Sequence, residues 1–143
     1  MTVSFQVTFD AADPDRLAHF WAAALGYQLQ PPPQGFETWE DFLRANDLFL
    51  DANNASAIVD PAGIAPRIYF QRVPESKSAK NRVHVDINVV GRRDVSREER
   101  LRLLVEEADR LVELGASKTE AYDEPGELWI VMRDPEGNEF CLQ

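Results

Sequence analysis

The chain has 143 residues, of which 44% are hydrophobic and 28% charged, and it carries a formal net charge of −10 at pH 7. This composition predicts one globular domain that can bury its own core. The acidic balance argues against nucleic acid and anionic membranes as partners, because both favour clusters of Lys and Arg. No apolar run is long enough to span a membrane, and the N-terminus lacks a signal-peptide pattern. The single cysteine, Cys141, allows no internal disulfide, so we expect a cytoplasmic protein.

The first predicted elements are a strand and a helix. Apolar and polar residues alternate strictly over residues 3–9, which predicts a strand with one apolar face. Asp13 is the predicted N-cap of a helix over residues 14–25, with Pro14 at its first position. Gly26 is the predicted stop, and residues 27–29 are long enough only for an edge strand.

Residues 34–54 form the least regular segment, after three prolines that predict an extended linker. Thr38 is a candidate cap for a short helix. The segment is rich in apolar side chains, namely Phe36, Trp39, Phe42, Leu43, Leu48 and Phe49. We interpret it as an insertion that packs on its own module, covers a cleft or contacts the partner in a homodimer, the commonest closed symmetry.

The remainder of the chain predicts a polar connector and one long helix among strands. Ser96 and Glu99 fit a capping box, and the helix that follows ends at Leu114-Gly115. The strand over residues 82–90 places Val83, Val85, Ile87 and Val89 on one face and its polar residues on the other. The other predicted strands cover residues 56–59, 67–73, 117–122, 128–133 and 139–143, with the connector at 74–81.

The two halves of the chain repeat one pattern: a strand, a helix with a Leu-Gly stop, then three strands. In both halves the last two strands flank an Asp-Pro-x-Gly turn, at Asp60 and at Asp134. The repeat predicts an α+β fold of two tandem βαβββ modules related by a pseudo-two-fold axis, with mixed sheets curling around a shared cleft. Module one covers about 1–74, the connector about 75–81 and module two about 82–143, within a single domain.

The repeat makes four positions equivalent in pairs. Gln6 matches His84 on the first strand of each module, and Tyr69 matches Cys141 on the last. Because residues two apart in a strand share a face, we expect these four side chains to converge on the shared cleft.

Several motifs resemble the vicinal oxygen chelate superfamily, within it the glyoxalase-like and bleomycin-resistance branch. They are Asp13-Pro14 to Phe20-Trp21, Leu25-Gly26, Arg82 to Asp86, Leu114-Gly115-Ala116 and Trp129 to Glu139 with its Asp-Pro-Glu-Gly-Asn turn. The resemblance implies two βαβββ modules around a cleft, with metal ligands on the first and last strands. His84 and Gln6 are the ligand types it carries over, whereas Tyr69 and Cys141 depart from it. We therefore expect no cofactor, or a weakly held divalent metal ion.

The candidate catalytic residues are His84 and Glu139. His84 either serves the site or only pairs with a neighbour such as Asp86. Glu139 is either a general base or the partner of Arg67 or Arg82.

The candidate ligand-binding residues are Gln6, Tyr69, Gln71, Asp86, Trp129 and Cys141. Asp86 either orients His84 or is solvated. Trp129 either stacks on a planar substrate or belongs to the core. Cys141 is either a small half-buried hydrophobe or a thiol activated by a nearby cation.

Two functions remain open from the sequence. The first is a glyoxalase-like protein that binds a small organic molecule in the cleft, with metal-assisted lyase, isomerase or dioxygenase-type chemistry. The second is a protein that sequesters a small molecule without transforming it, as resistance proteins of the branch do. A bound divalent ion favours the first, and a metal-free cleft lined by Trp129 and Tyr69 favours the second.

Overall fold

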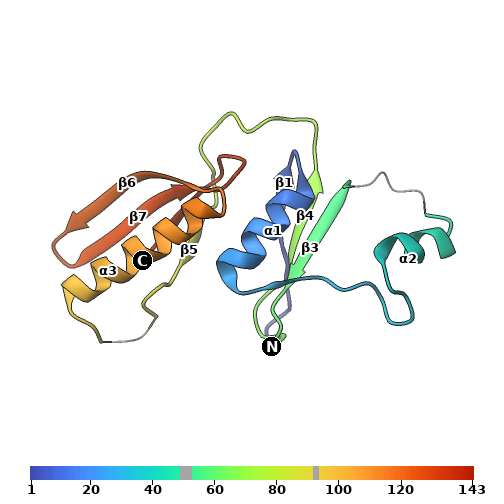
Figure 1. Cartoon of the computed structure of the whole chain (residues 1–143), viewed down its shortest axis with the longest axis horizontal. Helices are drawn as coiled ribbons and strands as arrows, with labels where there is room; N and C mark the ends of the chain where they lie inside the picture. The colour runs from blue at the N-terminus through green and yellow to red at the C-terminus, as the bar shows by residue number, and fades with distance from the viewer. Residues whose placement is uncertain (49–52, 92–93) are drawn as a thin grey trace. The chain divides into compact units, whose positions relative to one another are not determined.

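The computed structural model of the protein describes residues 1–48, 53–91 and 94–143, and it divides into two compact units, Met1–Glu75 and Ser76–Gln143. Each unit contains a four-stranded sheet with a long helix against one face (Figure 1). Phe49, which belongs to the apolar set predicted for the insertion, lies outside the described residues. The assignment of both units to one domain, and the cleft predicted between them, stay predictions.

The first unit has four strands and two helices. Its sheet has the order β1-β4-β3-β2, in which β1 is parallel to β4 and the other pairs are antiparallel. The elements are β1 (Val7–Ala11), α1 (Pro14–Leu25), β2 (Gln28–Leu29), α2 (Trp39–Ala45), β3 (Ala55–Val59) and β4 (Ile68–Arg72).

The second unit repeats the sheet of the first. Its order is β5-β8-β7-β6, again with one parallel pair, β5 with β8, at the start. The elements are β5 (Val85–Ile87), α3 (Arg97–Glu113), β6 (Ser117–Glu124), β7 (Glu127–Arg133) and β8 (Glu139–Leu142). The predicted α+β class with two tandem modules and mixed sheets is confirmed.

The caps predicted from the sequence define the helix ends. The Asp13 carboxylate accepts the Arg16 backbone N–H at 3.1 Å at the start of α1, and Gly26 ends this helix with a φ of 70°. Ser96 caps α3 in the same way by accepting the N–H of Glu99 at 3.1 Å.

Each core lies between one helix and one sheet face. Strand residues that alternate with exposed or half-buried ones are buried there, as the period of two requires. The buried side chains include Leu17, Trp21, Ile58, Ile68 and Phe70 in the first unit, and Leu104, Leu111, Ile130, Met132, Phe140 and Leu142 in the second. The other face of each sheet is left open for the residues of the candidate site.

Two predicted strands are shorter than their alternation suggested. β1 begins at Val7 rather than at residue 3, and β5 covers only Val85–Ile87 of the predicted 82–90. The register locates both corrections, because the paired residues begin at Val7 with Ile68 and at Val85 with Phe140. Residues ahead of the paired segments therefore leave the apolar face, and Phe5 and Val83 are 70% and 82% exposed.

The described part of the insertion forms a small aromatic cluster of its own, with one hydrogen bond to the segment after β2. Thr38 caps α2 by accepting the Asp41 N–H at 3.1 Å, as predicted. The rings of Phe36 and Trp39 both pack edge-to-face on Phe42. Trp39 also donates from Nε1 to the Gln30 carbonyl at 2.9 Å, which ties α2 to the end of β2.

Over residues 1–48, 53–91 and 94–143, no helix combines the length and the apolar character that crossing a membrane would require.

Candidate functional site

The register of the two parallel strand pairs gives the predicted repeat a structural form. Val7 lies opposite Ile68, and Val85 lies opposite Phe140. Gln6 and His84 each come one residue before Val7 and Val85. Tyr69 and Cys141 each come one residue after Ile68 and Phe140. The equivalences predicted from sequence therefore match the pairing of the strands. The same register makes Thr8 equivalent to Asp86, and Arg67 equivalent to Glu139.

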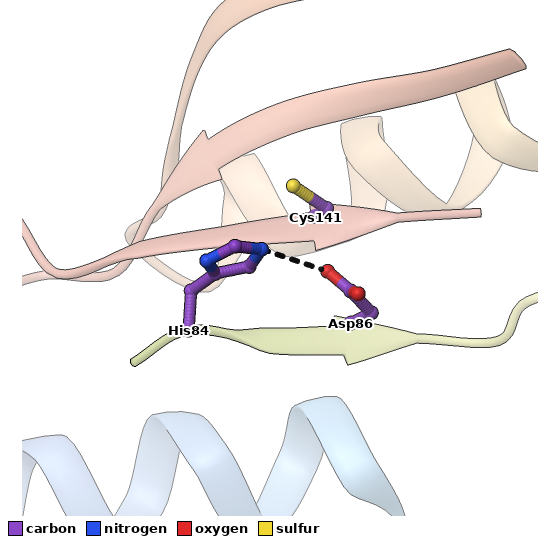
Figure 2. Close-up of side chains that lie close together, drawn as sticks. All are labelled: His84, Asp86 and Cys141. Atoms are coloured by element: carbon purple, nitrogen blue, oxygen red, sulfur yellow. Dashed lines mark ion pairs between the residues drawn. The ribbon is translucent and has the colours of Figure 1, made fainter. Parts of the chain in front are cut away.

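In the second unit, His84, Asp86 and Cys141 come together on the open face of the sheet. Figure 2 shows His84 and Asp86 projecting from β5 toward the same side as Cys141 of the neighbouring strand β8. One potential ligand atom from each residue lies within 4.8 Å of the others. His84 Nε2 and Asp86 Oδ1 are 3.4 Å apart, and both side chains are more than one-third exposed. The cluster is therefore open to solvent and to a ligand.

Cys141 carries a protonated thiol at neutral pH. Burial raises the pKa of the Cys141 thiol, and the neighbouring Asp86 carboxylate raises it further, against a smaller opposing effect of Lys80. A reactive cysteine needs a lowered pKa, because the thiolate is the nucleophile. The structure therefore favours a thiol that packs, or that loses its proton to a metal ion, over a free nucleophile.

Glu139 holds the connector in place. Its carboxylate lies 3.1 Å from Lys77 Nζ and accepts the Asn81 backbone N–H at 3.0 Å, so its cation partner is Lys77 rather than Arg67 or Arg82. These contacts, the backbone bond first, lower the pKa of Glu139 to about 2. A carboxylate with so low a pKa is a poor proton acceptor, which leaves His84 as the better candidate base.

A hollow of about 420 Å³ opens beside the cluster, lined by His84, Asp86 and Cys141 on one side and by Trp129 on the other. We call it the second-unit hollow. Trp129 is half-buried, and its ring stacks on Tyr122 with centroids 4.7 Å apart and an interplanar angle of 13°. The predictions did not include Tyr122. The turn at Pro125-Gly126 could have identified it, because a hairpin centred there puts Tyr122 opposite Trp129.

The equivalent residues of the first unit have a different chemistry. Gln6 Oε1 accepts a hydrogen bond of 2.7 Å from Arg67, and the Arg67 guanidinium lies 5.1 Å from the centre of the Tyr69 ring. Gln71 lies further along β4, opposite Asp10, and donates to the Arg72 carbonyl at 3.4 Å. No group of three His, Cys, Asp or Glu side chains gathers within the described part of this unit. Gln6 therefore contacts an arginine, and its predicted role as a metal ligand stays a prediction.

The donors of the second-unit cluster fit a divalent transition metal. An imidazole nitrogen, a carboxylate oxygen and a sulfur are ligands that zinc-like ions accept, and three protein ligands leave a position for a substrate. The set is less suited to magnesium, which prefers oxygen ligands and keeps its waters. The protonated thiol means that a metal ion must displace a proton to bind sulfur, so weak binding is expected.

Comparison with known proteins places the fold. The family model described as a glyoxalase-like domain matches residues 6–143, nearly the whole chain. No curated protein sequence matches the chain.

Several solved structures share the fold at low sequence identity. The fosfomycin resistance protein FosX of Listeria monocytogenes, in a complex with Mn(II) and a dihydroxypropylphosphonic acid, is 12% identical with a TM-score of 0.62. That match covers 100% of this chain and 92% of the other. The bleomycin-binding protein of Streptomyces verticillus, complexed with copper(II)-bleomycin, is 16% identical with a TM-score of 0.53, covering 100% and 96%. A possible glyoxalase from Bacillus cereus is 13% identical with a TM-score of 0.60, covering 100% and 99%.

The family match and these neighbours agree with the two βαβββ units and with the resemblance found in the sequence. The chain belongs to the glyoxalase-like domain family.

Proposed function

We propose that the protein binds a small organic molecule in the second-unit hollow, next to a loosely held divalent metal ion on His84, Asp86 and Cys141. The observation that carries this proposal is the juxtaposition of the three side chains, with ligand atoms within 4.8 Å, at the edge of a hollow of about 420 Å³. A volume of this size suits a small organic ligand. The FosX structure with Mn(II) and a phosphonic acid supports the pairing of metal and small molecule on this fold.

The residues of the site would either hold the metal ion or contact the organic ligand. A metal ion bound there would supply Lewis-acid polarisation of a substrate oxygen, which lyase- and isomerase-type reactions use, whereas dioxygenase-type chemistry would also need O₂ and a redox-active ion. His84 and Asp86, whose Nε2 and Oδ1 lie 3.4 Å apart, would hold the ion together with Cys141. Trp129 supplies an apolar wall for the body of the ligand.

Metal titration tests the proposal directly. We expect Zn²⁺ or Mn²⁺ added to chelator-treated protein to bind at one site. Isothermal titration calorimetry measures this binding. Asp86→Asn should weaken this binding by about tenfold or more, because it removes the charged ligand.

The matched control is Asp109→Asn. It removes an exposed carboxylate of α3 that pairs with Lys118 of β6. It should leave the metal affinity unchanged. Equal effects of the two substitutions, or the absence of binding to the wild type, would show that the cluster is not a metal site.

A second candidate function is sequestration of a planar molecule without chemistry. The stacked pair of Tyr122 and Trp129 favours it, because Trp129 lines the hollow and the Tyr122 ring packs against the Trp129 ring. The bleomycin-binding neighbour supports such a role on this fold. Fosfomycin and metal-free bleomycin serve as probes, and the part of the tryptophan fluorescence change that is lost in a Trp129→Phe variant reports on Trp129. Binding that survives a chelator favours sequestration, and binding that requires metal favours the metal-assisted function.

The predicted homodimer is kept as part of the proposal. Trp39 and Leu48 of the insertion are 40% and 50% exposed, which leaves apolar surface for a partner copy. Light scattering at micromolar concentration measures the mass. A strictly monomeric mass would assign the insertion wholly to its own unit. The cytoplasmic location stays a prediction.

A further inference from the structure

We propose that the first unit contains a separate binding site for a small organic anion, in which Arg67 receives a carboxylate or phosphate group and an apolar wall receives the rest of the molecule. The site lies in a hollow of about 750 Å³, the first-unit hollow, between α2 and the open face of the first sheet. It does not rest on the function proposed for the second unit, because it shares no residue with that site.

The wall of the first-unit hollow is apolar and partly aromatic. Leu29, Trp39, Leu43 and Tyr69 line it, from β2, α2 and β4. Trp39 is fixed by its hydrogen bond to the Gln30 carbonyl, so the indole does not need to be ordered when a ligand arrives. A volume of this order accommodates a two-ring organic molecule.

Arg67 is the polar anchor, and amides hold it in place. Its Nε donates to Gln30 Oε1 at 2.6 Å, and its Nη1 donates to Gln6 Oε1 at 2.7 Å. The face of its guanidinium lies over Tyr69. A guanidinium has five N–H donors, so donors remain after these two bonds are made. They have the fork geometry that binds the two oxygens of a carboxylate or phosphate.

The charge of Arg67 has no carboxylate partner among the described residues, since both of its hydrogen bonds go to neutral amides. Of the two acidic residues that line the same hollow, Glu40 is paired with Arg44 at 2.7 Å, and Asp15 is exposed and lies 3.6 Å from His19. A half-buried guanidinium held by neutral partners keeps its full attraction for an anion.

Binding of naphthalene derivatives tests the site. With EDTA present, 2-naphthoate and 2-naphthyl phosphate are titrated into the protein, followed by calorimetry and by tryptophan fluorescence. We expect the anions to bind at least about tenfold more tightly than neutral 2-naphthamide, the difference that one charge-assisted pair provides. Tighter binding of the phosphate assigns the site to phosphate esters, and tighter binding of the naphthoate assigns it to carboxylic acids.

Three substitutions of arginine separate the site from general charge effects. Arg67→Gln should weaken binding of the anions by at least about tenfold and leave the affinity for 2-naphthamide unchanged. Arg67→Lys keeps the charge but loses the two-pronged donor geometry. Its affinity for the anions should lie between those of Arg67→Gln and the wild type. Arg102→Gln removes the same charge from the exposed face of α3 in the second unit, where it lines no part of the hollow, and should change the affinity by less than about twofold.

Circular dichroism and thermal unfolding establish that each variant is folded. Three results would overturn the proposal: no binding of either anion at millimolar concentration, equal binding of the anions and the neutral amide, or equal effects of the Arg67→Gln and Arg102→Gln substitutions. Because 2-naphthamide is measured on the wild type, the charge requirement is tested even if a variant fails to fold.

Discussion

The two units share a sheet topology and a register, yet equivalent positions carry opposite chemistry. The first unit has Gln6, Arg67 and Tyr69 where the second has His84, Glu139 and Cys141. Arg67 is a cation held by two amides, whereas Glu139 is an anion held by Lys77 and a backbone N–H. One framework thus presents a positive group in the first unit and a cluster of metal-ligand types in the second.

The difference shows which features the fold dictates and which it leaves free. Alternation and strand pairing fix where a side chain points, because these are properties of the backbone. The identity of the side chain on the open face does not affect the core, so it can change without loss of the fold. The apolar residues opposite these positions stay large and buried in both units, as Ile68 and Phe140 do.

The largest expected effect concerns the turn that both units share. Asp134 is 3% exposed and accepts the backbone N–H groups of Glu136 and Asn138 at 2.9 and 3.0 Å. Asp134→Ala leaves buried donors without an acceptor and should lower the free energy of unfolding by about 3 kcal/mol, measured by urea denaturation. Asp60→Ala, at the more exposed equivalent turn, should lower it less because water can replace the carboxylate. Equal losses would contradict the role given to burial.

Replacing a residue of the second-unit cluster with its first-unit counterpart should weaken the proposed metal binding. His84→Gln exchanges an imidazole ligand for an amide, and we expect the affinity for Zn²⁺ to fall by at least about tenfold. Gln6→Ala is the matched control, since this residue contacts Arg67 and should not affect metal binding. Calorimetric titration measures both. An equal loss in the two variants would mean that the units do not differ in the way proposed.

The contacts of Glu139 should make the second unit sensitive to acid. Its folded-state pKa of about 2 lies below the ordinary value of 4.5, so the carboxylate contributes stability that is complete above pH 4.5. That contribution is lost as the pH falls from about 4.5 toward 2. The stability difference between wild type and Glu139→Gln should therefore shrink between pH 7 and pH 3 in urea denaturation. Glu37→Gln, at an exposed carboxylate, should show a small difference at both pH values.

The smallest effect is expected where the predicted strands failed to extend. Phe5 and Val83 occupy equivalent positions and are 70% and 82% exposed. Phe5→Ser and Val83→Ser should each change the free energy of unfolding by less than about 0.5 kcal/mol. Ile68→Ala, at a buried position of the paired segment, should reduce stability much more. A large loss in either serine variant would show that these residues are covered, for instance by a partner copy.

The fold was predictable because its signals are local or repeated. The caps at Asp13, Thr38 and Ser96, the stop at Gly26 and the paired Asp-Pro turns all lie in the structure where the sequence places them. Strand lengths were less predictable, since the alternation at residues 3–6 continues beyond the part of the chain that β4 can pair with.

The site was predictable only in part. Alternation placed His84, Asp86 and Cys141 on one face, and the structure brings them together. The partner of Glu139 came from the connector rather than from a strand, and no periodic pattern reports on such a contact. The anchoring of Arg67 by Gln30 depends on the register of β2, which is too short to be predicted with confidence from two residues.

The parallel strand pairs have a consequence for the order of folding. In each unit the strands on either side of the Asp turn are neighbours in sequence and can pair early, whereas Val7 must find Ile68, and Val85 must find Phe140, across most of a unit. Closing such long loops costs more chain entropy, so β1 and β5 are expected to dock last and to detach first. These are the strands at whose edges Gln6 contacts Arg67 and His84 approaches Cys141. A bound anion or metal ion would then stabilise the strand that docks last. Ligand binding would therefore slow hydrogen exchange in β1 or β5 before it changes exchange in the hairpins.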